Sequence, residues 1–163
     1  MTQIGYIALG SNLGDRLGYF KQAIASLHQN KIEIQAKSSI YISEPMGVET
    51  PQPDYFNAVI RISSQLDANA LLYVTQCIER QCGRMHKGQY QSRNLDLDII
   101  LYGQSKENNA LLTIPHPRFL ERNFVVTPLN EVLTSGWPES YDPLSTYLSQ
   151  LPPLKQHCEP QAW

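Results

Sequence analysis

The sequence predicts an α+β fold in which a single antiparallel sheet carries helices on one face. Short apolar runs with alternating polarity indicate strands, and stretches whose apolar residues stand three and four apart indicate amphipathic helices. These segments follow one another in the order β-α-β-β-α-β. That order favours an antiparallel sheet with both helices packed against the same face.

The first part of the chain supplies a strand, a helix and a second strand. Residues 4–9 form a short apolar run that stops at Gly10 and Ser11, which is typical of a strand followed by a turn. Asp15 places negative charge at the start of the helix. The second strand is predicted over residues 32–42. The apolar stripe of the intervening helix consists of Leu17, Phe20, Ile24 and Leu27.

A loop rich in proline separates the second strand from the third. It has roughly ten residues and includes Pro45 and Pro53. Residues 55–62 alternate again and predict the third strand. Asp67 is the expected N-cap of a second helix, and Gly83 is its expected C-cap. The apolar stripe of that helix consists of Leu71, Val74, Ile78 and Cys82.

The fourth strand completes a ferredoxin-like arrangement, whose open sheet face is available to carry a site. The side chains expected on the core face of this strand are those of Leu95, Leu97, Ile99 and Leu101. Beyond Gly103 we expect short helices within residues 119–130 and an irregular, proline-rich stretch over residues 138–153. We treat residues 1–163 as one domain with C-terminal additions.

Composition and charge exclude several functional classes. The 163 residues include 13 Lys and Arg against 15 Asp and Glu, a net charge of −2, which is not the footprint of a protein that binds duplex nucleic acid. Three cysteines without paired spacing argue against disulfides and zinc, and indicate free thiols in a reducing compartment. The sequence shows neither an apolar run that could span a membrane nor a signal peptide. We expect a cytoplasmic protein without nucleic-acid or membrane partners.

The most informative residues are Asp96 and Asp98, which stand two apart in the fourth strand. Side chains at that spacing project from the same face, with backbones roughly 6–7 Å apart. Two such carboxylates repel each other unless a cation lies between them, and Mg²⁺ binds carboxylates together with water and substrate phosphates. Arg84 and Arg93 lie just upstream, and guanidinium groups match phosphate oxygens. This pattern favours metal-assisted chemistry on a phosphorylated substrate over the alternative, the solvated face of a half-exposed sheet.

Further candidates for anion binding lie on the second helix and in a later loop. Glu79 stands near the end of that helix, where it either contacts a substrate or faces solvent. His116 lies between two prolines and either donates a hydrogen bond to a phosphate or is an exposed loop residue. Arg118 and Arg122 follow it and favour the anion site.

Aromatic and amide side chains at the start of the third strand could bind a flat heterocycle. Tyr55 and Phe56 offer stacking, Asn57 offers directional hydrogen bonds, and Phe124 could form a second wall; the alternative is ordinary core packing. The glycine turn after the first strand is not a phosphate loop, since no lysine follows Gly14. Phosphate handling would therefore come from arginines and a metal.

Taken together, five segments resemble the 6-hydroxymethyl-7,8-dihydropterin pyrophosphokinases, a family of folate biosynthesis. The resemblance runs over nearly the whole chain and is looser towards the C-terminus. The segments are residues 6–15, 52–58, 78–84, 93–99 and 114–119, together with Arg122 and Phe124.

The resemblance implies transfer of a diphosphoryl group from ATP to the hydroxymethyl oxygen of the pterin, with release of AMP and with two Mg²⁺ ions on the phosphates. By position, Asp96 and Asp98 resemble the metal ligands. They and two phosphate-contacting arginines are the expected catalytic residues, namely Arg84, Arg93, Asp96 and Asp98. The expected ATP contacts are Gln76, Glu79, Lys87, His116, Arg118 and Arg122. The expected pterin pocket consists of Ser43, Met46, Tyr55, Asn57 and Phe124. The partners are these small substrates, and the expected state is a monomer.

The residues just before the aspartates depart from the family pattern. Family members usually have Arg-Trp-Gly-Pro-Arg there, whereas this chain has Gln89-Tyr90-Gln91-Ser92-Arg93, so Tyr90 replaces a tryptophan that covers the pterin. A non-catalytic relative that binds pterin or nucleotide therefore stays an alternative. A third hypothesis, a ferredoxin-like interaction or RNA module, is disfavoured by the net charge and by the missing RNA-binding aromatic pattern.

Overall fold

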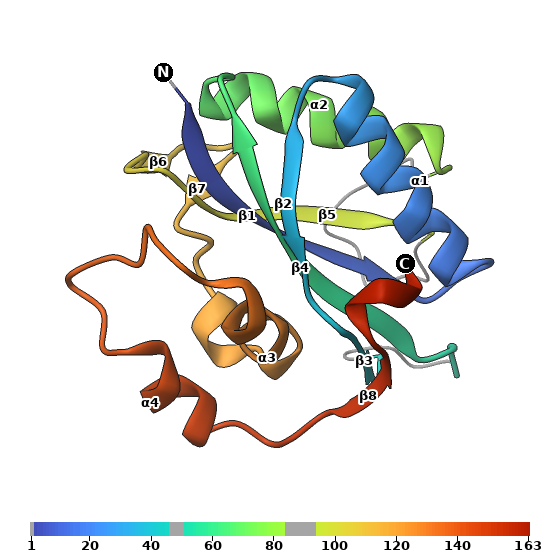
Figure 1. Cartoon of the computed structure of the whole chain (residues 1–163). Helices are drawn as coiled ribbons and strands as arrows, with labels where there is room; N and C mark the ends of the chain where they lie inside the picture. The colour runs from blue at the N-terminus through green and yellow to red at the C-terminus, as the bar shows by residue number, and fades with distance from the viewer. Residues whose placement is uncertain (1, 46–50, 84–93) are drawn as a thin grey trace.

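One six-stranded antiparallel sheet forms the centre of the protein (Figure 1). The computed structural model describes residues 2–45, 51–83 and 94–163, so the predictions for Met46, Arg84, Lys87 and Arg93 lie outside the described residues. The elements in chain order are β1 (Gln3–Ser11), α1 (Arg16–Gln29), β2 (Glu33–Lys37), β3 (Ile40–Ser43), β4 (Tyr55–Ser64), α2 (Ala68–Gln81), β5 (Asp96–Tyr102), β6 (Glu107–Asn108), β7 (Thr113–Ile114), η1 (Phe119–Glu121), α3 (Asn123–Val132), α4 (Leu144–Ser149), β8 (Lys155–Cys158) and η2 (Pro160–Ala162).

The strands of the sheet neighbour one another in the order β5-β1-β4-β3-β8, and β2 pairs with the opposite end of β4 from β3. The predicted order of strands and helices is present, but the expected strand over residues 32–42 is two strands. Ser38 separates them because its hydroxyl accepts the Val59 N–H at 2.9 Å and donates to the Ser39 carbonyl at 2.7 Å. A side chain that takes over a backbone partner in this way interrupts the regular ladder.

The helix boundaries follow the predicted capping residues. The Asp15 carboxylate accepts the Gly18 N–H at 3.0 Å, and the Asp67 carboxylate accepts the Ala70 N–H at 2.8 Å. At the other end of α2, Cys82 is the cap, and Gly83 follows it with φ +91°. Side chains other than glycine rarely adopt that conformation, so Gly83 terminates the helix as the sequence predicts.

Two apolar cores lie on opposite faces of the sheet. On one face, Phe20 of α1 and Ile78 of α2 belong to a core built with the sheet. Helix α3 covers the other face (Figure 1). Its Val126 and Leu129 pack with Tyr6 and its neighbours. The prediction that this second face is open is therefore wrong over the part that α3 covers. The reason is the apolar side of α3, which must be buried against another element.

The expected alternation along β5 is broken by a bulge. The register with β1 shifts by one residue between Tyr6 and Ile7, which are paired with Leu101 and Ile99. Ile100 and Leu101 both join the core under α3, whereas Leu97 and Ile99 join the opposite core. The prediction that Leu101 shares a face with Leu97 is therefore wrong, because a bulge inserts one unpaired residue and inverts the alternation beyond it. The two aspartates precede the bulge and keep their predicted orientation.

The prediction that the proline-rich residues 138–153 are irregular is wrong over Leu144–Ser149, which are helical. The C-terminal stretch therefore contains regular structure. It forms α4 and then β8, which pairs with the outer edge of β3 (Figure 1). The C-terminal Trp163 is buried, donates from Nε1 to the Ser38 carbonyl at 3.0 Å and packs against Phe20. Among the described residues, the helices are too short or too polar to cross a bilayer.

Candidate active site

Strand register brings the predicted metal ligands onto the same face of the sheet as Asn57, one residue of the predicted heterocycle pocket. Asp96 is paired with Gly10, which is paired with Asn57, which is paired with Tyr41. These four residues form a row across β5, β1, β4 and β3. Neighbouring strands lie about 4.8 Å apart, so Asp96 and Asn57 are separated by roughly 10 Å. The row therefore has the span to hold a phosphate group and a heterocycle side by side.

Helix α3 borders this row. The next row along the strands contains Asp98, Ala8 and Val59, and the latter two belong to the core beneath α3. In the first row Gly10 has no side chain, and a Cβ atom placed there would lie 3.7 Å from the ring of Tyr55. The ring of Tyr55 thus lies beside Gly10 in the part of the face beyond α3.

The two aspartates suit a hard cation. Both are half-buried, and Leu97 between them is buried on the opposite side of the strand. Within the described residues there is no group of three or more His, Cys, Asp or Glu that could enclose a metal by itself. A pair of carboxylates on one face fits Mg²⁺, which completes its octahedral shell with water and substrate phosphates.

Asn57 is held in one orientation by its neighbours on β3. It is 4% exposed, and its Nδ2 donates to the Ser43 hydroxyl at 2.8 Å and to the Tyr41 carbonyl at 3.2 Å. A carbonyl oxygen can only accept, so the NH₂ group must face β3 and Oδ1 must face away from it. Asn57 therefore presents a fixed acceptor of the kind that reads an N–H edge of a heterocycle. Ser43, Tyr55 and Asn57, three of the predicted pterin residues, are brought together.

A carboxylate that sequence reasoning missed joins α3 to this end of the sheet. Glu131 accepts from the backbone N–H of Ser39 at 3.0 Å, from the Ser39 hydroxyl at 2.9 Å and from the hydroxyl of Tyr41. Burial raises the pKa of the Tyr41 hydroxyl well above its ordinary value, and the hydrogen bond to Glu131 raises it further. The contact fixes Tyr41 at the end of the row that contains Asn57.

The Tyr41 contact predicts a pH dependence of stability. The stabilisation is fully present below the unfolded-state pKa of about 10 and is lost as the pH rises through the higher folded-state pKa. Tyr41→Phe lacks the ionisable hydroxyl, so its free energy of unfolding should fall less steeply than that of the wild type above about pH 10. Urea unfolding at a series of pH values measures both slopes. Equal slopes would show that Tyr41 does not carry the effect.

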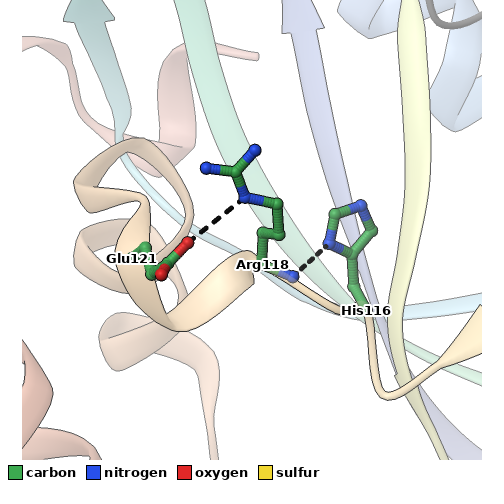
Figure 2. Close-up of polar contacts among 3 residues, drawn as sticks. All are labelled: His116, Arg118 and Glu121. Carbon is green, nitrogen blue, oxygen red and sulfur yellow. Dashed lines mark hydrogen bonds and ion pairs between the residues drawn. The ribbon is translucent and has the colours of Figure 1, made fainter.

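The loop that contains His116 lies along the outer edge of β5. The backbone N–H of His116 donates to the Ile100 carbonyl at 3.0 Å, and the side chain is half-buried. Its Nδ1 accepts the backbone N–H of Arg118, and the two atoms are 3.4 Å apart. Figure 2 draws this contact as a dashed line. A neutral imidazole that accepts at Nδ1 carries its proton on Nε2, which makes Nε2 the donor. Because its side chain is half-buried, the alternative of an exposed loop histidine is wrong.

The three other predicted cationic and aromatic contacts lie around η1 and the start of α3. Arg118 is mostly exposed and forms an ion pair with Glu121 at 3.2 Å (Figure 2). Exposed pairs of this kind contribute only about 0–1 kcal/mol, so Arg118 can exchange Glu121 for another anion at little cost. Arg122 is half-buried, and its guanidinium lies 5.8 Å from the ring centroid of Phe124, which packs against the core under α3.

Glu79 contacts β5 from the side of α2, the face opposite to the aspartates. Glu79 is 3% exposed, and its Oε2 accepts the backbone N–H of Leu97 at 2.8 Å. The alternative of a solvent-facing glutamate is therefore wrong. Gln76 is half-buried one turn earlier on the same side of α2. Since β5 lies at one edge of the sheet as far as the structure describes it, groups from both faces and from the His116 loop can meet around it.

Two polar residues, Asn12 before α1 and Arg16 in its first turn, hold the loop that leads into β4. The buried Asn12 donates from Nδ2 to the Gln52 side chain at 3.1 Å and to the Pro53 carbonyl at 3.2 Å. Arg16 donates to the Asp54 carbonyl at 2.7 Å. These contacts fix the backbone just before Tyr55. Helical periodicity and strand alternation give no indication of them, because they join residues about forty positions apart.

Comparisons with known proteins find relatives that share one named activity. Residues 6–134 match the family model for 7,8-dihydro-6-hydroxymethylpterin-pyrophosphokinase. The chain is 42% identical over 133 residues to the 2-amino-4-hydroxy-6-hydroxymethyldihydropteridine pyrophosphokinase of Bacillus subtilis, covering 81% of this chain and 79% of that protein. It is 38% identical over 144 residues to the enzyme of the same name from Porphyromonas gingivalis, covering 86% and 97%.

Some relatives are longer than this chain, and the match covers only part of their length. The mitochondrial folate synthesis bifunctional protein of Pisum sativum is 41% identical over 127 residues, and the match covers 78% of this chain but 24% of that protein. A solved structure of wild-type Plasmodium falciparum HPPK-DHPS has a TM-score of 0.69 at 12% identity, covering 92% of this chain and 44% of the other. That likeness supports the fold alone.

Proposed function

We propose that the reaction of this chain uses two Mg²⁺ ions and that Asp96 and Asp98 hold them. The chain belongs to the 7,8-dihydro-6-hydroxymethylpterin-pyrophosphokinase family and therefore transfers diphosphate from ATP to the hydroxymethyl group of a dihydropterin in folate synthesis. The observation that carries the proposal is the strand register, which sets Asp96 and Asn57 in one row of the same face.

In the proposed site, the two substrates occupy opposite ends of the row that runs across β5, β1, β4 and β3. The pterin lies at the β4–β3 end, where Asn57 offers a fixed acceptor and Tyr55 an aromatic ring. The triphosphate lies at the β5 end, beside Asp96, Asp98 and the His116 loop. When bound, Mg²⁺ neutralises charge on the phosphate oxygens and orients the triphosphate for in-line attack. Met46 for the pterin and Lys87 for ATP remain predictions from the resemblance, as do ATP contacts by Gln76, Arg118 and Arg122.

In the proposed reaction the hydroxymethyl oxygen of the pterin forms a bond to the β-phosphorus of ATP. The bond between that phosphorus and the oxygen bridging to the α-phosphate breaks, and AMP leaves. The hydroxyl proton passes to a carboxylate oxygen of Asp96, which is the carboxylate in the row of Asn57. His116 stabilises negative charge on the phosphates through Nε2–H. Transfer of this kind depends on positioning and charge neutralisation more than on covalent chemistry by the protein.

Product analysis tests the proposed function. The purified protein is incubated with ATP, Mg²⁺ and 6-hydroxymethyl-7,8-dihydropterin, and adenine nucleotides are separated with and without the pterin. We expect AMP that depends on both Mg²⁺ and the pterin. ADP as the product, or binding of both substrates by calorimetry without turnover, would contradict the proposal; the second result would identify a non-catalytic relative.

Arg93 is expected to act on the reaction more than on binding. A guanidinium that offsets charge as the bridging oxygen departs interacts more strongly with the transition state than with the ground state. Arg93→Ala should therefore lower kcat by about 10²–10³-fold with a smaller change in the KM for either substrate. The same is proposed for Arg84. Steady-state kinetics with each substrate varied in turn separates the two parameters, and a change confined to KM would refute the assignment.

Four broader assignments accompany the proposal. The order β5-β1-β4-β3, with α1 and α2 on one face, supports placing the core in the ferredoxin-like class and treating residues 1–163 as one pyrophosphokinase domain. The thiols of Cys77, Cys82 and Cys158 are free, which supports a reducing, cytoplasmic location. We also propose that the protein acts as a monomer. Gel filtration with light scattering would contradict this last assignment by showing a dimer.

A further inference from the structure

Two contacts tie the end of α2 to the start of β5. The Glu79 carboxylate accepts the Leu97 N–H at 2.8 Å, and the Asn94 side-chain amide donates to the Cys82 carbonyl. Gly83 makes the second contact possible, because a Cβ atom on it would lie 2.7 Å from Nδ2 of Asn94. The end of α2 and the start of β5 are thus joined by two hydrogen bonds.

The hydrogen bond from Leu97 to Glu79 lies between the two aspartates in sequence. Leu97 is the residue between Asp96 and Asp98, so its backbone sets the direction in which both carboxylates leave the strand. Among the described strands, β5 lies at one end of the sheet order, so N–H groups on its outer side face no other described strand. A carboxylate acceptor gives a stronger hydrogen bond to an amide than a neutral acceptor does. Glu79 is buried at this point, at 3% exposure.

We propose that Glu79 is a positioning residue for the metal site, which acts by fixing the Leu97 backbone and with it the orientation of Asp96 and Asp98. This inference rests on the proposed function for its biological meaning. It also gives Glu79 a role different from the ATP contact that the family resemblance implies. A direct ATP contact would require the carboxylate to reach the nucleotide, whereas the observed Oε2 is directed at the strand backbone.

Three variants separate these roles. Glu79→Ala removes the acceptor, whereas Glu79→Gln keeps an oxygen that can accept the Leu97 N–H but removes the charge. The matched control is Thr75→Val, since Thr75 is buried on the same helix and its hydroxyl donates to the Leu72 carbonyl of that helix. Each variant is measured for its melting temperature, for hydrogen exchange of the Leu97 amide by NMR, and for Mn²⁺ affinity by electron paramagnetic resonance with a non-hydrolysable ATP analogue.

We expect Glu79→Ala to lower Mn²⁺ affinity by about 10–100-fold, the usual effect of losing a group that orients metal ligands. The Leu97 amide should exchange faster in this variant, whereas Glu79→Gln should keep both properties close to wild type. Thr75→Val should change only the melting temperature. Unchanged Mn²⁺ affinity in a folded Glu79→Ala protein would overturn the inference. So would equal losses in Glu79→Gln and Glu79→Ala, since the charge rather than the hydrogen bond would then be required.

The measurement does not depend on turnover. If the wild type formed no AMP, the proposed function would fail, while the Mn²⁺ and exchange data would still decide the role of Glu79. If the wild type is active and Glu79→Ala raises only the KM for ATP, the proposed function stands and the positioning role is wrong.

Discussion

Asp98→Ala is expected to lower Mg²⁺-dependent formation of AMP by about 10²–10³-fold, the usual cost of removing one group that stabilises transition-state charge. Asp98 is half-buried on the same face as Asp96, and a single remaining carboxylate cannot replace its oxygen ligands. The fold should be intact, because the change removes repulsion between two like charges. Initial rates over a range of Mg²⁺ concentrations, with circular dichroism of both proteins, measure the effect.

Glu33→Ala is the matched control for this prediction. It also removes one negative charge from a strand, but Glu33 is exposed on β2 and is paired with Ser63, six residues along β4 from Asn57. That separation corresponds to about 20 Å along the strand. We expect its rate to remain within about twofold of wild type, since isolated surface changes are usually small. Retained activity in a folded Asp98→Ala protein would contradict the metal-ligand assignment.

Asn57→Ala is expected to raise the Kd for the pterin by about 10²-fold while leaving the Kd for ATP near its wild-type value. The variant removes the fixed acceptor and leaves the Ser43 hydroxyl and the Tyr41 carbonyl without their donor. A site built to hydrogen-bond a polar group discriminates strongly when that bond is lost. Calorimetric titration with each substrate separately gives the two affinities.

Two further variants define the result at Asn57. Asn57→Asp keeps the shape but cannot donate to Tyr41 and Ser43, so it should bind pterin as poorly as Asn57→Ala. Asn30→Ala removes an exposed amide whose donor binds only the Ser26 carbonyl of its own helix, and should leave both affinities unchanged. Equal weakening of ATP and pterin binding by Asn57→Ala would show that the residue supports the fold rather than one substrate.

The sequence predicts those parts of the site that depend on local geometry. Alternation in β5 places Asp96 and Asp98 on one face, and the capping carboxylates of Asp15 and Asp67 start both helices where expected. These features involve residues within four positions of one another, so periodicity and capping rules describe them. The cross-strand row is different: it depends on register between four strands, which the family resemblance implied but which periodicity alone does not give.

The features that sequence reasoning missed are set by tertiary contacts. Ser38 divides the second predicted strand because its hydroxyl accepts the N–H of Val59 on β4, twenty-one residues later. Glu131 is an exposed polar residue on α3 by its pattern, yet it accepts two hydrogen bonds from Ser39, which lies ninety-two residues away, just before β3. The solvent-facing alternative for Glu79 failed for the same reason, since its partner Leu97 lies on another element.

Anomalous X-ray diffraction from crystals grown with Mn²⁺ and a non-hydrolysable ATP analogue tests the central claim most directly. Mn²⁺ shares the oxygen preference of Mg²⁺ and gives a peak that identifies the ion. We expect anomalous density within coordinating distance of carboxylate oxygens of both Asp96 and Asp98, adjacent to the phosphates of the analogue. Bound nucleotide whose phosphates and metal ions lie away from these two carboxylates would contradict the account.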